Sequence, residues 1–292
     1  MKILVFGSNG QVGKSIRDIE NTHFEEHNLK FFSKEELDIS NSQTCREVIS
    51  AEDPSLIINA AAYTAVDNAE IDHENAHLIN NVAVRNIANI CKDLDVWLVH
   101  ISTDYVFDGN EFSPYDENSL PNPQTVYGIS KLKGEHAIKN SGCKYIILRT
   151  SWVFSEYGSN FLISMINLAK KRDTLKIVSD QIGCPTFAQD IAITTSLVLK
   201  NLRNNQLSSN IYHYSGDIQC SWFEFAGIIF SEASKIGFQT PSKVIPIQTS
   251  EFPTLAERPK YSVLKCSKIK TELNIKPSDW RKGVKKALKN LK

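Results

Sequence analysis

Short apolar runs alternate with longer amphipathic stretches in the first half of the chain. Five runs rich in β-branched and aromatic residues, at 3–6, 29–32, 56–58, 96–101 and 145–148, contain few polar side chains. Nearly continuous hydrophobicity is typical of strands that are covered on both faces. Helical patterns separate these runs, at 12–19, 42–52, 74–94 and 130–139. The alternation predicts βαβ units and therefore an α/β fold with a doubly wound parallel sheet.

The pattern changes after residue 150. We expect helices at 161–171 and 191–202, short strands at 175–178 and 211–214, and an irregular, proline-punctuated segment at 241–259. The sequence therefore predicts a dinucleotide-binding domain over 1–150 and, over 151–292, mainly a smaller mixed α/β lobe that binds the substrate. Because no low-complexity linker separates the two parts, we expect the second to exchange elements with the first.

The first predicted strand leads directly into a glycine-rich turn. Gly7, Gly10 and Gly13 stand between this strand and the first predicted helix. Glycines at such a turn let the backbone approach a pyrophosphate, which then meets free N–H groups and the positive end of the helix dipole. A plain tight turn is the alternative, since GxxGxxG differs from the familiar GxGxxG. The strand–turn–helix context favours dinucleotide binding and a Rossmann-like domain.

The residues after the second predicted strand bear on which dinucleotide binds. An acidic residue there favours NAD, whereas basic groups favour the 2′-phosphate of NADP. Ser33 and Lys34 stand at this strand end, so we expect NADPH, with NADH as the alternative. Alternatively, Lys34 is only a solvated surface charge and does not indicate which cofactor binds. Asp38 and Ile39 follow where an adenine ring is expected, although Asp38 would serve equally as a helix cap.

A tyrosine and a lysine four residues apart stand in the stretch "VYGISKLKGE". On a helix Tyr127 and Lys131 share one face. The pKa of tyrosine is about 10, and a nearby ammonium group lowers it toward the range that general acid–base catalysis requires. Ser102 and Thr103 follow the fourth predicted strand, at the edge where parallel sheets build their sites. A hydroxyl there can hydrogen-bond a substrate carbonyl, or simply the backbone.

Composition and charge narrow the range of partners and compartments. Lys and Arg total 33, as do Asp and Glu, so the net charge of zero gives no reason to expect nucleic acid or an anionic membrane as partner. Six scattered cysteines have no metal-ligand spacing and are expected as reduced thiols of a cytoplasmic protein without a metal. We find neither a signal peptide nor an apolar run of about 20 residues.

Several motifs together resemble the extended short-chain dehydrogenases/reductases. They are the three glycines, "NAAAYTAVDNAE" at 59–70, "STDYVFDG" at 102–109, "VYGISKLKGE" at 126–135 and "RTSWVF" at 149–154. Within this superfamily, "SWVF", "DQIGCPT" at 180–186 and "ERPKYSVL" at 257–264 are most similar to the dTDP-4-dehydrorhamnose reductase family. The similarity runs nearly from end to end.

The resemblance implies NAD(P)H-dependent reduction of the C4 ketone of dTDP-4-dehydro-β-L-rhamnose to dTDP-β-L-rhamnose, a sugar donor for cell-envelope polysaccharide such as lipopolysaccharide O-antigen. It implies that Tyr127 donates the proton, that Lys131 holds the nicotinamide ribose and lowers the pKa of the tyrosine, and that Thr103 orients the carbonyl. The matching cofactor positions are Gly10, Gln11, Val12, Asp38, Ile39, Ala62, Tyr63 and Thr64, and the matching sugar-nucleotide positions are Thr103, Asp104 and Trp152.

For some residues the sequence leaves two interpretations. Trp152 would stack on a sugar or fill the core between the lobes, and Arg258 would grip phosphate or form a surface salt bridge. Asn81 matches an asparagine that the superfamily often uses, or bonds one helix to another. His100 is expected as a satisfied core histidine, and the acidic residues of 67–74 as a solvated stretch.

The chain departs from the family pattern just after the glycine turn, and two other functions are compatible with the motifs. Some family members carry an acidic residue just after the glycine turn in a magnesium-bridged dimer, whereas Lys14 and Ser15 stand here. The sequence therefore gives no support for magnesium, and a homodimer is expected without that contact. The rival functions are another nucleotide-sugar 4-ketoreductase, epimerase or dehydratase, and a noncatalytic regulatory subunit of the same fold.

Overall fold

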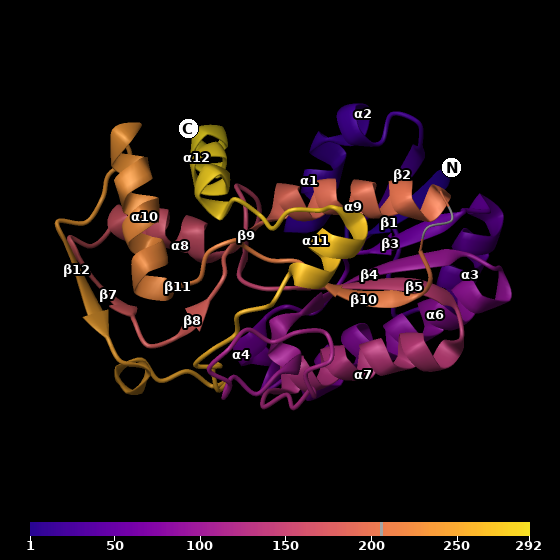
Figure 1. Cartoon of the computed structure of the whole chain (residues 1–292), viewed down its shortest axis with the longest axis horizontal. Helices are drawn as coiled ribbons and strands as arrows, with labels where there is room; N and C mark the ends of the chain where they lie inside the picture. The colour runs from indigo at the N-terminus through magenta and orange to yellow at the C-terminus, as the bar shows by residue number, and fades with distance from the viewer. Residues whose placement is uncertain (205–206) are drawn as a thin grey trace.

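A six-stranded parallel sheet forms the centre of the larger lobe (Figure 1). The computed structural model describes residues 1–204 and 207–292. The strand order is β10-β5-β4-β3-β1-β2, so the doubly wound fold is confirmed. The order reverses between β1 and β3, and ligands bind at the carboxyl ends of the strands beside such a reversal. The strands are β1 (Lys2–Phe6), β2 (Asn28–Phe32), β3 (Leu56–Asn59), β4 (Trp97–Thr103), β5 (Lys144–Thr150) and β10 (Asn210–His213).

Helices cover both faces of this sheet, as Figure 1 shows. Alternate side chains of β1 enter different core layers: Ile3 and Val5 pack on one side, Leu4 and Phe6 on the other. This explains the continuous apolar runs, because neither face of a central strand meets water. The first layer contains α1 (Gln11–Asp18), α9 (Ala188–Arg203) and α11 (Ser267–Leu273), and the second contains α3 (Ser42–Glu52), α6 (Val84–Asp93) and α7 (Val126–Ser141).

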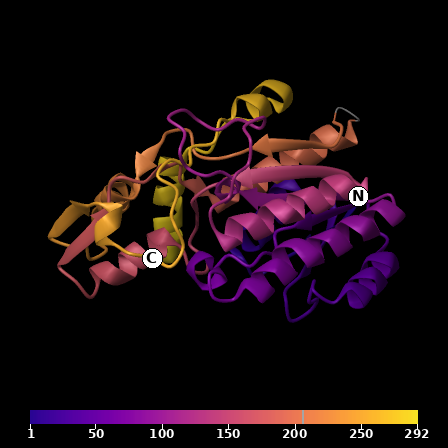
Figure 2. The ribbon, with the colours of Figure 1, turned by 90° about the horizontal axis from the view of Figure 1, so that it is seen from below.

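The chain beyond residue 150 contributes to both lobes. Strand β10, expected as a short strand of the second part, pairs in parallel with β5 at the edge of the large sheet. Helices α9 and α11 also pack on the large sheet, where they complete the first core layer. The remaining elements form the smaller lobe beside it (Figure 2).

The smaller lobe packs three helices against a two-stranded parallel sheet. Its strand β12 (Lys243–Ile247) lies in the segment that was expected to be irregular, so that prediction is wrong there. Pro246 is compatible with this strand because a two-stranded sheet leaves each strand an unpaired edge. The other elements are β7 (Thr174–Val178), α8 (Phe161–Ala169), α10 (Trp222–Lys235), α12 (Trp280–Leu291), and the two-residue strands β6 (Val153–Phe154), β8 (Ile182–Gly183), β9 (Thr186–Phe187) and β11 (Cys220–Ser221).

The long helix expected at 74–94 contains a π-helical segment. It forms as α5 (His73–His77), the π segment η1 (Leu78–Ala83) and α6. A π segment widens the helix and rotates the residues within it, and such segments are frequent at functional sites. The remaining short elements are α2 (Glu20–His23), α4 (Val66–Ala69) and the 3₁₀ turns η2 (Asp104–Val106) and η3 (Thr249–Glu251).

The proline-rich loop between η2 and α7 ties the C-terminal segment to the large lobe. The backbone N–H of Tyr115 donates to the carbonyl of Val263 at 2.9 Å, and that of Lys265 donates to the carbonyl of Tyr115 at 2.8 Å. The Tyr115 ring stacks on Phe107 with centroids 4.3 Å apart. Residues just before this junction, including Arg258, are thereby held beside the carboxyl edge of the sheet.

The cysteines and the helices can be compared with the expectations from composition. All six cysteines are buried thiols, with no disulfide in the described ranges. No helix within residues 1–204 or 207–292 has both the length and the apolar character needed to cross a membrane.

A buried ion pair joins α7 to the sheet. Arg149 on β5 donates to both carboxylate oxygens of Glu135 on α7, at 2.9 and 2.6 Å. Ser102 on β4 donates to the same carboxylate at 2.6 Å. His213 on β10 lies with Nε2 3.4 Å from Nη1 of Arg149, and its Nδ1 is 3.0 Å from the carbonyl of Tyr115. Because guanidinium only donates, Nε2 accepts and Nδ1–H donates, so His213 is neutral.

Acid should destabilise the fold through His213. Burial, reinforced by the positive charge of Arg149, lowers its pKa from 6.5 to about 3. Below pH 6.5 the unfolded chain binds a proton that the folded protein excludes, so each pH unit costs about 1.4 kcal/mol until the folded pKa is reached. We expect His213→Gln to flatten the free energy of unfolding against pH between about pH 6 and about pH 4, measured by urea denaturation. His136→Gln is the control, since His136 is exposed on α7 and is not part of this buried cluster.

Candidate active site

The turn after β1 has a backbone that requires glycine. Gly7 has φ +79°, in the left-handed region, and a Cβ there would lie 2.6 Å from the backbone nitrogen of Ala61. A Cβ on Gly13 would lie 2.4 Å from the carbonyl oxygen of Gly7. The turn is therefore pressed between the end of β3 and the first turn of α1. This close packing leaves the N–H groups at the start of α1 beside an open space.

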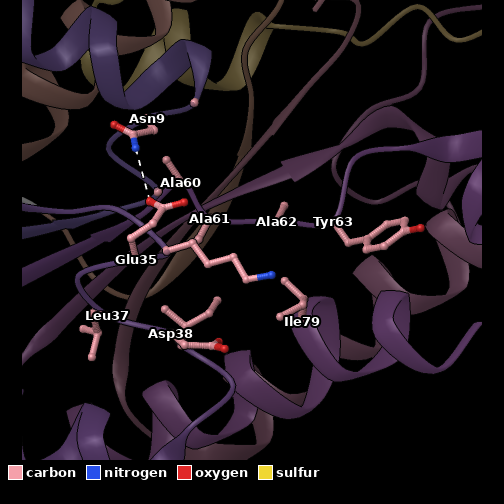
Figure 3. A pocket seen from close by; sticks show the side chains of 13 residues that line it. Asn9, Glu35, Leu37, Asp38, Ala60, Ala61, Ala62, Tyr63 and Ile79 are labelled. Atoms are coloured by element: carbon pink, nitrogen blue, oxygen red, sulfur yellow. Dashed lines mark hydrogen bonds between the residues drawn. The ribbon is translucent and has the colours of Figure 1, made fainter. Parts of the chain in front are cut away.

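A pocket of about 280 Å³ lies next to this turn (Figure 3). Small side chains at the end of β3, at 60–62, form one wall, and residues that follow β2 form another. Figure 3 shows Asn9 reaching from the turn toward Glu35, and its Nδ2 donates to Oε2 at 3.4 Å. Of the predicted cofactor residues, Gly7, Gly10, Lys34, Asp38, Ile39, Ala62 and Tyr63 line this pocket.

Ser33 closes a turn in this structure, and its contact with the cofactor stays a prediction. Its hydroxyl accepts from the N–H of Glu36 at 3.3 Å, and its own N–H donates to the carboxylate of Glu36 at 2.7 Å. The buried serine thus closes the turn after β2, while the pocket wall is formed by Lys34 and Glu35. Sequence reasoning missed Glu35, although an acidic residue shortly after the second strand is the signal that favours NAD.

Asp38 lines the pocket but does not cap a helix. Its carboxylate accepts from the N–H and the hydroxyl of Ser40, at 2.9 and 2.7 Å, and these bonds lower its pKa. The cap of α3 is Asn41, whose side chain accepts from the N–H of Thr44. The carboxylate of Asp38 therefore stays ionised at the pocket wall.

A second pocket, of about 570 Å³, opens between the two lobes. It shares Gly10, Ala60 and Ala62 with the first, so the two are neighbours along the carboxyl edge of the sheet. It brings together residues that lie far apart in the sequence. Among the predicted site residues, its walls include Gln11, Val12, Thr64, Thr103, Asp104, Tyr127, Lys131, Trp152 and Arg258.

Tyr127 keeps its proton more firmly than the sequence predicted. It is 8% exposed, and burial raises its pKa above the ordinary value, against a smaller opposing effect of a hydrogen bond with Thr103. The amine of Lys131 lies on β4 instead, with Nζ 3.1 Å from Nε2 of His100 and 2.7 Å from the carbonyl oxygen of Ile101. The prediction that Lys131 lowers the pKa of the tyrosine is therefore wrong in this structure, because desolvation dominates.

Thr103 and Asp104 form a polar pair at the end of β4. The Thr103 hydroxyl donates to Oδ1 of Asp104 at 3.0 Å and accepts from the N–H of Tyr105 at 3.2 Å. Oδ2 of Asp104 is buried and forms no hydrogen bond of ordinary geometry with the residues that the structure describes. Burial raises the pKa of Asp104 to about 6, against smaller lowering effects of the nearby Ser262 and Thr103 hydroxyls. An unsatisfied carboxylate oxygen at a pocket wall suits a ligand hydroxyl.

Trp152 offers a sugar neither face of its indole. One face stacks on Trp222 with centroids 3.4 Å apart and the rings 5° from parallel. The other lies so close to Gly183 that a Cβ there would be 2.5 Å from Cε2 of Trp152. Trp152 also has φ +47°, an uncommon value for a bulky residue. The predicted stacking on a sugar is wrong for this arrangement, and contact by the rim of the indole stays a prediction.

Arg258 is held by protein groups at the pocket wall. Nη1 donates to the hydroxyl of Tyr105 at 2.8 Å, and Nη2 forms an ion pair with Asp67. The acidic stretch is therefore not simply solvated. Glu70 accepts from the N–H of Val126, the first residue of α7, at 2.9 Å. Binding of phosphate by Arg258 stays a prediction that would require these bonds to rearrange.

The asparagine that organises the site is Asn80, not Asn81. Asn80 Oδ1 accepts from the N–H of Tyr63 at 2.9 Å, and Nδ2 donates to the carbonyl of Tyr63 and to Ser130, each at 3.0 Å. The Asn81 amide instead lies 3.3 Å from His77 on the same helix. Both asparagines fall in the π segment, whose rotation cannot be judged from a regular helical period.

A lysine, Lys14, stands just after the glycine turn, where some family members carry an acidic residue linked to magnesium. Lys14 Nζ lies 5.3 Å from the centroid of the Tyr157 ring, in the loop that follows β6. Gln11 reaches the same loop, where it accepts from Ser155 and Asn160, each at 2.9 Å. In the described part of the chain no cluster of three or more His, Cys, Asp or Glu side chains is placed to hold a metal.

Comparisons with known proteins agree with this geometry. The family model of the RmlD substrate binding domain matches residues 1–292. A dTDP-4-dehydrorhamnose reductase from Aggregatibacter actinomycetemcomitans is 40% identical over 289 residues, covering 97% of both chains. The chain belongs to the dTDP-4-dehydrorhamnose reductase family. The enzyme of that name from Escherichia coli K12 is 36% identical over 297 residues, which are 100% of this chain and 98% of that protein.

A solved structure extends the agreement to three dimensions. The crystal structure of dTDP-4-dehydrorhamnose reductase from Bacillus anthracis, in complex with NADP, is similar with a TM-score of 0.90 and 37% identity. The match covers 100% of this chain and 99% of that one. The family resemblance identified from motifs is therefore confirmed along the whole chain.

The glycine turn of this dTDP-4-dehydrorhamnose reductase family member should tolerate little added volume. Gly13→Ala places a methyl group against backbone, so we expect a loss of about 1–3 kcal/mol in stability and NADPH binding weaker by about tenfold or more. Urea denaturation and fluorescence titration measure the two effects. A Cβ on Gly227 in α10 would have no atom of the described residues within 4 Å. Gly227→Ala is therefore the control, and should stabilise by about 0.5–1 kcal/mol without affecting binding.

Proposed function

We propose that this protein catalyses the NAD(P)H-dependent reduction of the C4 ketone of dTDP-4-dehydro-β-L-rhamnose to dTDP-β-L-rhamnose. Full-length membership of the dTDP-4-dehydrorhamnose reductase family supports the assignment. The observation that carries it is the convergence of Tyr127, Lys131 and Thr103 in one pocket next to the glycine turn. We also infer a cytoplasmic location and keep the homodimer as the expected assembly.

The residues present fit a nicotinamide dinucleotide. The turn at Gly7 and Gly13 excludes side chains, and the wall at 60–62 carries only alanines, so backbone can approach a bound group closely. The start of α1 would hold the pyrophosphate, while Lys34, Glu35 and Asp38 would surround the adenosine end. When bound, the cofactor supplies the hydride.

The protein's own part is positioning and proton transfer. Thr103 would hydrogen-bond the substrate oxygen and Asp104 a neighbouring hydroxyl, since its Oδ2 forms no hydrogen bond of ordinary geometry in the described structure. Tyr127 would donate its proton to the oxygen as the carbonyl becomes an alcohol. Burial keeps the phenol protonated near neutral pH, and the proton can transfer once reduction of the carbonyl makes the substrate oxygen a much stronger base.

Replacing the phenol tests the proton donor. Tyr127→Phe should bind NADPH with unchanged affinity but lose about 10²–10⁴-fold in turnover, which is the usual contribution of general acid catalysis. NADPH consumption with dTDP-4-dehydrorhamnose, together with identification of the product sugar, measures this. Tyr145 lies at the opposite end of β5, so Tyr145→Phe is the matched control and should retain activity. Cofactor binding without turnover in the parent protein would favour the regulatory alternative.

Charge at the adenosine pocket should set the cofactor preference. We infer that Lys34 favours the 2′-phosphate of NADPH while Glu35 favours the hydroxyl of NADH. An exposed ion pair contributes up to about 1 kcal/mol, or roughly fivefold in affinity. Lys34→Ala should therefore weaken NADPH by about that factor and leave NADH nearly unchanged, whereas Glu35→Gln should strengthen NADPH and weaken NADH. Isothermal titration with both cofactors measures the four effects, and an equal response of both cofactors would contradict the assignment.

A further inference from the structure

A cation at the wall of the interlobe pocket is held by two protein side chains. Among the described residues of this wall, Lys131 and Arg258 carry positive charge. The amine of Lys131 donates to the backbone of β4. The guanidinium of Arg258 instead donates from Nη1 to the hydroxyl of Tyr105, and its Nη2 pairs with the carboxylate of Asp67. A guanidinium fork of this kind suits the oxygens of a phosphate as well as those of a carboxylate.

The ion pair between Arg258 and Asp67 is open to exchange. Their side chains are 27% and 38% exposed, so water and ligands reach both. The pair of Arg149 and Glu135 is only 3% and 1% exposed, and breaking that pair would leave a buried charge without a partner. An ion pair in contact with water contributes little free energy, because water can replace either partner. A diphosphate can therefore displace Asp67 from Nη2 and leave the carboxylate hydrated.

The backbone on both sides of Arg258 is anchored, so the exchange involves the side chain. Oδ1 of Asp67 accepts from the backbone N–H of Ala256 at 3.1 Å, while Oδ2 faces Nη2 of Arg258. After Arg258, the backbone N–H of Tyr261 donates to the carbonyl of Gly109 at 3.2 Å. One oxygen of Asp67 thus anchors the segment, and the other holds the guanidinium.

We propose that Asp67 is a positioning residue that occupies Arg258 in the ligand-free protein and yields it to the diphosphate of the sugar nucleotide. The inference rests on the proposed function, whose substrate carries this diphosphate. Nη1 keeps its bond to Tyr105 during the exchange, so the guanidinium turns about a fixed point. An anion that gains less from Arg258 than the carboxylate does leaves the pair intact, so Asp67 also adds selectivity.

Tyr105 connects Arg258 to the residues that act on the ketone. Its ring lies edge-on against the ring of Tyr127, with centroids 5.5 Å apart and an angle of 74° between the planes. Its backbone N–H donates to the hydroxyl of Thr103 at 3.2 Å. A diphosphate bound at Arg258 is therefore placed relative to the phenol and the hydroxyl of the site.

The affinity for dTDP tests the inference without turnover. In Asp67→Asn the amide oxygen still accepts from the N–H of Ala256, while the NH₂ group faces Nη2, so the segment stays anchored and the guanidinium is released. We expect dTDP to bind about fivefold more tightly, as the loss of a partly exposed ion pair implies. Isothermal titration of dTDP into the NADPH-loaded protein measures this. Unchanged or weaker binding would overturn the inference, because Asp67 would then not compete for Arg258.

A second substitution shows whether Asp67 acts through Arg258. Arg258→Gln should weaken dTDP by about tenfold or more, as the loss of a charged hydrogen bond implies. Asp67→Asn should then add little in that background. A fivefold gain that persists without Arg258 would contradict the inference, because Asp67 would only repel the ligand. Asp93→Asn is the matched control, since Asp93 pairs with Arg46 on the exposed surface, and this variant should bind dTDP like the parent.

The outcomes are distinct from instability and from failure of the proposed function. Urea denaturation reports the fold of each variant. Asp67→Ser is measured alongside and should also tighten dTDP, because its hydroxyl can accept from the N–H of Ala256 but carries no charge. If neither the parent nor the Asp67 variants bind dTDP, Arg258 meets no diphosphate and the inference is wrong. A parent protein that binds dTDP and NADPH but leaves the ketone unreduced would refute the proposed function alone.

Discussion

The position of α7 on the sheet is the constraint on which the site depends. Tyr127 and Lys131 lie one helical turn apart, so both reach the pocket only when α7 has one rotation relative to β4 and β5. Glu135, a turn further on, accepts hydrogen bonds from Ser102 on β4 and Arg149 on β5. Desolvation offsets most of the attraction in a buried pair, but losing one partner costs about 3–5 kcal/mol. The pair therefore specifies geometry more than it adds stability.

Local patterns were sufficient for the elements of the first half, because strands buried on both faces are continuous apolar runs and their helices are amphipathic. They were insufficient where the partner is distant. Strand β10 was expected, but its place beside β5 depends on chain that returns from the smaller lobe. Strand β12 contains Pro246, which argues against a strand unless the edge is known to be free.

The same distinction holds within the site. Tyr127, Lys131 and Thr103 were brought together by rules of helix spacing and strand ends, which involve only neighbouring residues. The direction of the Lys131 amine depends on His100, an apolar-flanked residue that looked structural. The pairing of Arg258 with Asp67 joins positions 191 residues apart, and no periodicity reports such a contact.

Trp152 has a consequence for how the two lobes work together. Its indole lies between Gly183 and Trp222, both in the C-terminal half of the chain, while its backbone follows β5 of the large sheet. Both indoles pack against the core of the smaller lobe, so the chain that leaves β5 at Thr150 is anchored in that lobe within two residues, and aromatic pairing and burial stabilise this anchor. The width of the interlobe pocket is thus preorganised, and an arriving sugar nucleotide spends little of its binding energy on closing the protein around itself.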